Sequence, residues 1–137
     1  FPYTTLFRSD FHVELNEDNF NLLVQSVSEL SSVIGENQIE TKSISLLFLQ
    51  MNYGMHSFEK ILTSFSRYVS DESLVEIKYG DLTNIIDSYI SNEKLVTPLV
   101  KYQIINGFAN NYVPELKPIV EELQSNVGLI INENFES

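Results

Sequence analysis

The fold class follows from residues 20–34, FNLLVQSVSELSSVI, in which apolar side chains recur at steps of three and four. The members of this series are Phe20, Leu23, Val27, Leu30 and Ile34. At 3.6 residues per turn this spacing places all of them on one stripe of an α-helix. We expect the helix to bury that stripe against neighbouring helices.

The same spacing recurs further along the chain. A second series consists of Ile44, Leu47, Met51, Met55, Phe58, Leu62, Phe65 and Val69. A third consists of Leu99, Tyr102, Ile105, Phe108 and Tyr112, and a fourth of Leu116, Val120, Leu123, Val127 and Ile130. Four long stripes with shorter segments between them predict an all-α fold, an antiparallel helical bundle of five or six helices.

The first helix is expected at Glu17–Ile34, with Asn16 or Asp18 as its N-cap. Gly35 follows it directly, and glycine is common just past the end of a helix. Before this helix, apolar and polar residues alternate over residues 11–15, FHVEL. A period of two is typical of a β-strand, so one short N-terminal strand is a further possibility.

The second helix is expected to begin after Asn37, where Glu40 completes a capping-box spacing, and to continue to Val69. A helix of some 30 residues would be about 45 Å long at 1.5 Å per residue. Gly54 lies near its middle and permits a bend there.

Two shorter helices are expected next, at residues 71–79 and 82–90, with Asp81 placed to cap the second. Beyond them, Thr97 and Pro98 have the pattern of an N-cap followed by the first helical position. Proline suits that position because its missing N–H would have no partner within the helix.

Composition bounds the class of protein. The chain has 137 residues, 43% of them apolar, which suits one domain with one core. Its net charge of -11 at pH 7 is the wrong sign for a phosphate backbone or an anionic membrane surface. No apolar run approaches the roughly 20 residues that span a bilayer. We expect no nucleic-acid partner, no membrane attachment and a cytoplasmic location.

The first nine residues, FPYTTLFRS, resemble translated sequencing-adapter DNA, and the chain begins with Phe1 rather than Met. We expect residues 1–9 to be a non-native segment. Residues 10–137 are then expected to form a single helical-bundle domain, a fragment of a longer protein.

Acidic residues dominate the N-terminal third of the chain. Residues 10–40 hold seven acids and no base, whereas all but one of the bases lie from Lys42 onward. The first helix should therefore carry an acidic outer face. A solvated surface explains that face, and docking to a basic partner surface is the alternative.

Residues that could carry catalysis are scarce. The natural bases near neutral pH are His12 and His56, and one His without a second ligand at helical spacing makes no metal site. Cysteine is absent, which excludes a disulfide, a thiolate metal site and a cysteine nucleophile. The five glycines are scattered singly, so no phosphate-binding loop is evident. We expect no metal, no cofactor and no enzymatic activity.

His56 carries the one specific catalytic hypothesis. Helical spacing places it off the apolar stripe that holds Met55 and Phe58, so it should face solvent. The segment GMHSFEK around it resembles histidine phosphotransfer domains, whose exposed helical His accepts a phosphoryl group from a receiver aspartate. The resemblance implies that His56 is the phosphoacceptor and Lys60 the nearby cation. Glu59 stands where that family has lysine, and a surface His without a special role is the alternative.

We interpret the chain as a non-enzymatic helical interaction or regulatory module, associated with bacterial signalling, that binds a protein partner or a second copy of itself. Phosphotransfer through His56 is one alternative. A bundle that binds a small apolar ligand among its tyrosine and methionine side chains is the other.

Overall fold

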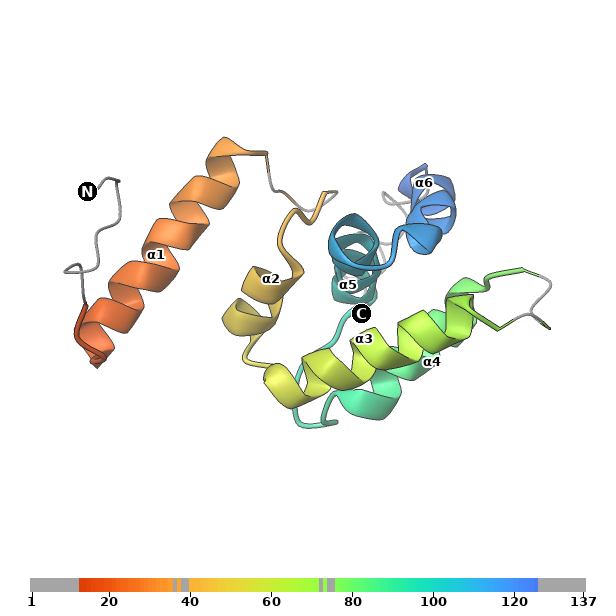
Figure 1. Cartoon of the computed structure of the whole chain (residues 1–137), viewed down its shortest axis with the longest axis horizontal. Coiled ribbons are helices and arrows are strands. Elements are labelled where there is room, and N and C mark those ends of the chain that lie inside the picture. The colour runs from red at the N-terminus through yellow and green to blue at the C-terminus, as the bar shows by residue number, and fades with distance from the viewer. Residues whose placement is uncertain (1–12, 36, 38–39, 72, 74–75, 126–137) are drawn as a thin grey trace, which may run out of the picture.

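A computed structural model describes residues 13–35, 37, 40–71, 73 and 76–125 (Figure 1). Six α-helices and one 3-10 helix make up this part of the chain, and it contains no strand. They are α1 (Glu17–Val33), α2 (Ile44–Met51), α3 (Met55–Val69), α4 (Tyr79–Tyr89), α5 (Pro98–Asn111), η1 (Pro114–Leu116) and α6 (Lys117–Gln124). The predicted all-α class and the number of helices are confirmed.

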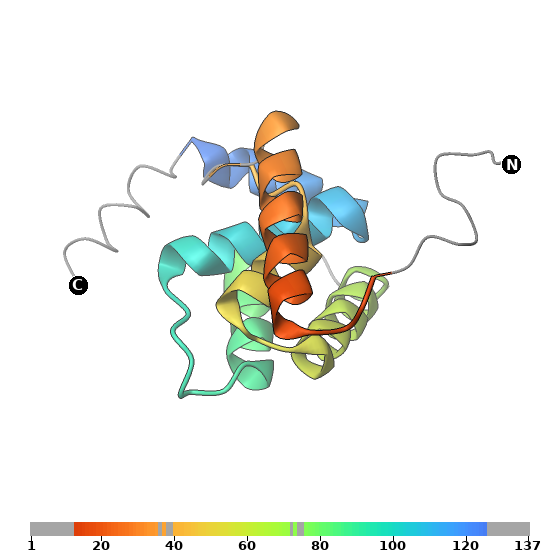
Figure 2. The same cartoon turned by 90° about the vertical axis from the view of Figure 1, so that its left-hand side faces the viewer.

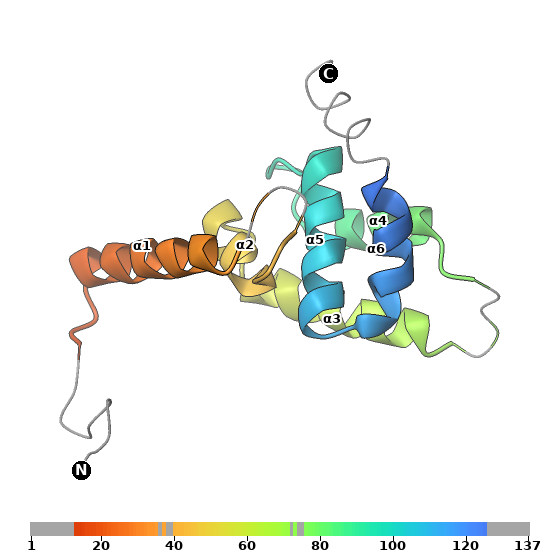
Figure 3. The ribbon, with the colours of Figure 1, turned by 90° about the horizontal axis from the view of Figure 1, so that it is seen from above.

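Helix α5 lies at the centre of the helical body. Residues 104–109 are all buried, and the helix packs against α2, α4, η1 and α6. Figure 3 shows α6 lying alongside α5 after the short connection through η1. As predicted, Thr97 caps α5, because its hydroxyl oxygen accepts a hydrogen bond from the N–H of Val100 at 3.2 Å, and Pro98 is the first helical residue.

Helices α3 and α4 form an antiparallel pair. At one end the Ser57 hydroxyl donates to the carbonyl oxygen of Tyr89 at 2.7 Å. At the other end the Tyr68 hydroxyl donates to Oδ2 of Asp81, also at 2.7 Å. The start of each helix therefore lies beside the end of the other, as expected of an antiparallel bundle.

Aromatic rings fill the junction of α2, α3 and α5. The ring of Phe108, which is fully buried, lies 5.9 Å from that of Phe48, 5.2 Å from that of Phe58 and 5.4 Å from that of Phe65. Edge-to-face and tilted pairs at these distances add to the energy of apolar burial. Phe108 thus joins three helices at one point.

The single long helix predicted to end at Val69 is wrong, because the chain breaks it into α2 and α3. Asn52 adopts the left-handed conformation at φ 58°, and Gly54 follows at φ 94°. The N–H of Tyr53 returns to the carbonyl oxygen of Phe48 at 3.0 Å, which closes the end of α2. Asn and Gly are the residues that tolerate positive φ at least cost, so the bend expected at Gly54 is a full break.

The predicted start of that helix after Asn37 is also wrong. Oδ1 of Asn37 does accept a hydrogen bond from the N–H of Glu40 at 2.9 Å, but the helix itself begins at Ile44. Its N-cap is Ser43, whose hydroxyl oxygen accepts from the N–H of Leu46 at 3.1 Å. The Asn37 side chain thus bonds to the backbone of Glu40 and does not cap a helix.

Two further predictions fail in the parts of the chain that the structure describes. The expected helix at 71–79 is not formed at residues 71, 73 and 76–78, and Asp81 lies in the first turn of α4 rather than at its N-cap, Lys78. The strand expected at 11–15 is not formed at 13–15, since no other strand is present there to pair with it. Phe11 and His12, like residues 1–9, lie outside the described residues.

The segment between α1 and α2 is fastened to α5 by three asparagines. Oδ1 of Asn106 accepts a hydrogen bond from the buried N–H of Thr41 at 2.6 Å, and Nδ2 of Asn110 donates to the carbonyl oxygen of Thr41 at 2.9 Å. Nδ2 of Asn111 donates to the carbonyl oxygen of Lys42 at 3.0 Å. The first bond satisfies a buried backbone N–H, and the three together hold the segment that leads into α2 against α5.

Candidate interaction surface

Helix α1 begins at Glu17, as its local sequence predicts, and ends at Val33, one residue before the predicted end. Oδ1 of Asn16 accepts a hydrogen bond from the N–H of Asn19 at 2.8 Å, so Asn16 is the N-cap and Asp18 lies in the first turn. Gly35 follows the helix at φ 97°. An acidic first turn is favoured by the helix dipole.

The other residues that the structure describes cover only one edge of α1. Figures 1 and 3 show this helix at one end of the molecule, beside α2 and remote from α6, and Figure 2 shows it in front of the other helices. Nε2 of Gln50 in α2 donates to the Ser28 hydroxyl at 3.1 Å, and Ser31 is the only fully buried residue of α1. The edge that faces the body is therefore small, and it consists of Ser28 and Ser31 beside the half-buried Val24 and Val27.

Most of the apolar side of α1 is exposed. Six apolar side chains are between 51% and 81% exposed: Phe20, Leu22, Leu23, Leu30, Val33 and Ile34. We call this set the α1 apolar face. At 100° per residue its members lie within an arc of about 160°.

The expectation that the stripe of the first helix enters the core is therefore wrong. Of its five members, Val27 is partly covered, and the other four belong to the exposed α1 apolar face. Helical spacing shows which side of a helix is apolar, but it does not show which element, if any, covers that side.

The α1 apolar face carries no charge. The acids of this helix are Glu17, Asp18 and Glu29, all about 100° or more from the centre of the face. Residues 13–35 contain no lysine or arginine. An apolar partner can thus pack along the face without desolvating a charged group.

Leu22 and Val33 belong to this surface but lie outside the stripe predicted from the sequence. They widen the apolar arc well beyond a single stripe. One helix–helix contact does not bury an apolar arc of that width. The width of the arc is therefore the signal in the sequence that could have indicated a second partner for this helix.

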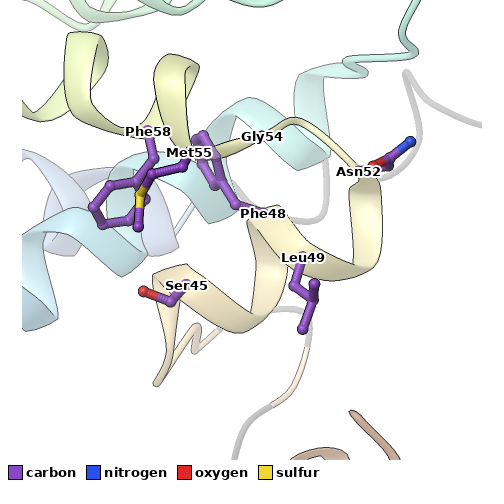
Figure 4. Close-up of a pocket in the computed structure, with 7 residues that line it drawn as sticks. All are labelled: Ser45, Phe48, Leu49, Asn52, Gly54, Met55 and Phe58. Atoms are coloured by element: carbon purple, nitrogen blue, oxygen red, sulfur yellow. The ribbon is translucent and has the colours of Figure 1, made fainter. Parts of the chain in front are cut away.

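A hollow lies where α2 ends and α3 begins. Figure 4 shows the side chains of Phe48, Leu49, Met55 and Phe58 around it, beside Ser45, Asn52 and Gly54. Its volume is about 230 Å³. Ligand sites for drug-sized molecules are larger, roughly 300–1,000 Å³, so this cleft suits only a small apolar group.

His56 and Lys60, the candidate phosphotransfer residues, are both exposed. Because α3 begins at Met55, His56 is its second residue and lies in the first turn rather than in the middle of a long helix. Lys60 follows four residues later, on the same side of the helix. Glu59 is exposed next to it.

Two tyrosine hydroxyl groups join segments of the fold. The Tyr53 hydroxyl donates to the carbonyl oxygen of Leu95 at 2.6 Å, and that of Tyr68 donates to Asp81. Burial raises the pKa of Tyr53, Tyr68 and Tyr102 above the usual value. Tyr53 and Tyr68 thus use their hydroxyl groups to join segments of the chain.

Among the described residues, no group of three or more His, Asp or Glu side chains is placed to hold a metal ion. None of the helices in those ranges combines the length and the apolar character that crossing a membrane requires. Comparison with protein families, with curated proteins and with solved structures gave no match.

Proposed function

We propose that this chain is a non-enzymatic interaction module that binds a protein through the α1 apolar face. The exposure of six large apolar side chains along one helix carries the proposal. Together they present on the order of 600 Å² of apolar surface, at the upper end of the largest patches found on monomers. Patches of that size usually mark binding sites.

The energy available at this surface is sufficient for specific binding. At about 25 cal/mol per Å², burying roughly 600 Å² corresponds to about 15 kcal/mol before the costs of association. Those costs are about 4–15 kcal/mol, so the net affinity depends on how well the partner fits. An amphipathic helix fits best, because it can lie along the whole length of the face.

Charge supports a protein partner. The net charge of -11 disfavours nucleic acid, and the acids of α1 would repel an acidic surface beside the face. We place the module in the cytoplasm, associated with bacterial signalling. The absence of cysteine is consistent with that location.

The proposal is tested by selecting peptides against the chain. A displayed library of amphipathic helical peptides is selected on the wild-type protein. The enriched peptides are then bound to the double variant Leu23→Glu/Leu30→Glu and to the control Gln25→Glu, which changes the polar side of the same helix. We expect binding to be lost in the double variant and kept in the control. Peptides that bind both variants equally, or a selection that enriches none, would refute the proposal.

The cleft between α2 and α3 supports a second candidate function, the binding of a small apolar ligand. Its lining is mainly apolar, with Leu49 and Met55 partly open to solvent. A ligand at 100 times its dissociation constant would stabilise the fold by about 2.7 kcal/mol. Thermal unfolding with benzene-sized ligands tests this, and the shift should vanish in Leu49→Gln. No shift with any such ligand excludes the candidate.

Phosphotransfer through His56 is a third candidate, supported by an exposed imidazole with Lys60 one turn away. A phosphoryl group would pass from a receiver aspartyl phosphate to an imidazole nitrogen of His56. Incubation with a phosphorylated receiver should label the wild type and leave His56→Gln unlabelled. Equal labelling of both proteins, or no labelling of either, rules it out.

A further inference from the structure

We infer that the α1 apolar face binds a second copy of this chain, as an antiparallel pair of α1 helices related by a two-fold axis. The inference rests on the proposed function and names the partner. Three observations carry it: the area of the face, the spacing of its residues and the position of the charges on α1.

The area matches what a dimer needs. Each copy contributes on the order of 600 Å², so the pair buries about 1,200 Å² in total, which is the lower limit for specific interfaces. In a two-fold dimer the same surface supplies both sides of the contact. No second kind of surface is required.

The spacing matches a helix of the same length. Phe20, Leu23, Val27, Leu30 and Ile34 follow the three-and-four steps of a coiled-coil seam, and of these only Val27 is partly covered by its own chain. The seam is about 21 Å long from Phe20 to Ile34. Ser26 lies within the exposed arc between Leu23 and Leu30, and its small side chain allows a second helix to approach closely.

The charges of α1 select the antiparallel orientation. Glu17 and Asp18 lie in its first turn, and residues 13–35 contain no base to offset them. A parallel pair would bring four carboxylates together at one end. An antiparallel pair centred on the seam separates the two acidic turns by about 28 Å along the helix axis, well beyond the Debye length of roughly 8 Å in physiological salt. It also places the helix dipoles in opposite directions.

Light scattering of the full chain over a range of concentrations is the first test. We expect a mass of twice 15.7 kDa at high concentration. Leu23→Glu/Leu30→Glu places charged groups in the seam and should raise the dissociation constant of the dimer by at least about 100-fold. The matched control Gln25→Glu should dimerise like the wild type. If the double variant loses helical circular dichroism, the single variant Leu22→Glu replaces it, because Leu22 is exposed.

Cysteine cross-linking tests the orientation. The chain has no native cysteine, so each substitution introduces a single thiol. Ser26→Cys lies near the midpoint of the seam and should form a disulfide-linked dimer with itself. Phe20→Cys and Ile34→Cys, which lie at opposite ends of the seam, should not cross-link separately, but a mixture of the two should. A parallel pair would instead cross-link each variant with itself, which would refute the stated orientation.

Failure of this inference can be separated from failure of the proposed function. A chain that stays monomeric at millimolar concentration overturns self-association. If selected peptides nonetheless require Leu23 and Leu30, the α1 apolar face still binds a protein, and its partner is a different chain. If the chain stays monomeric and no selected peptide requires Leu23 and Leu30, both the inference and the proposed function are wrong.

Discussion

Gly107→Ala tests the close contact between α5 and the start of α2. A Cβ atom added at Gly107 would lie 3.0 Å from both Cβ and Cδ1 of Ile44 and 3.0 Å from Cγ2 of Thr41. Carbon atoms in contact prefer about 3.5–4.0 Å. Ile44 and Thr41 are themselves buried, so neither side chain can move away freely.

Two opposing effects determine the size of the change. Alanine is favoured over glycine in a helix interior by about 0.8–1 kcal/mol. Overpacking of a buried contact costs about 1–3 kcal/mol. We therefore expect Gly107→Ala to lower the free energy of unfolding by up to about 2 kcal/mol, although alanine is the better helix former.

Gly80→Ala is the matched control, because a Cβ at Gly80, in the first turn of α4, would have open space around it. Only the helix preference then acts, and this variant should be more stable by up to about 1 kcal/mol. Urea unfolding of both variants gives the comparison. Equal stability of Gly107→Ala and Gly80→Ala would contradict this prediction, because the contact between α5 and the start of α2 would then be looser than described.

Three further predictions concern the core and the break between α2 and α3. Phe108→Ala removes the ring that joins three helices and should cost about 3–5 kcal/mol in urea unfolding, whereas a loss below about 1 kcal/mol would contradict a packed aromatic junction. Asn52→Ala should cost about 1–2 kcal/mol because of the positive φ, whereas Asn52→Gly should be neutral or stabilising; equal stability of the two would argue against the left-handed conformation. Burial holds the pKa of Tyr53, Tyr68 and Tyr102 above 10.0, so the stability linked to them is present below pH 10 and is lost as the pH rises through the raised values. Tyrosinate absorbance should accordingly show a late-titrating group in the folded protein, and a single titration near pH 10 would be inconsistent with that burial.

Local signals in the sequence were enough to predict several helix ends. Asn16 and Thr97 cap α1 and α5, and Gly35 follows α1, because capping depends on a few neighbouring residues and their backbone hydrogen bonds. The break at Asn52 was underestimated. Asn in a helical pattern costs little, and its left-handed state here accompanies the burial of Tyr53 against Phe48 and the carbonyl of Leu95.

The candidate interaction surface was only half predictable. The apolar spacing of Phe20, Leu23, Leu30 and Ile34 was evident from the sequence, and the helix that it predicts is present. These side chains stay uncovered because of where the segment after α1 attaches to the body. Asn106 holds that segment through its hydrogen bond to Thr41, a contact between residues 65 positions apart in the sequence. Long-range contacts of that kind leave no periodic signal.

If the proposed function holds, the α1 apolar face binds another chain and is no part of the core of its own chain. Urea unfolding at several protein concentrations, for the wild type and for Leu23→Glu/Leu30→Glu, tests it most directly. We expect the wild-type midpoint to rise with protein concentration and the variant midpoint to stay constant, with the two free energies of unfolding agreeing within about 0.5 kcal/mol at the dilute limit. A variant that is several kcal/mol less stable at every concentration would contradict the account, because these leucines would then belong to the core of a single chain.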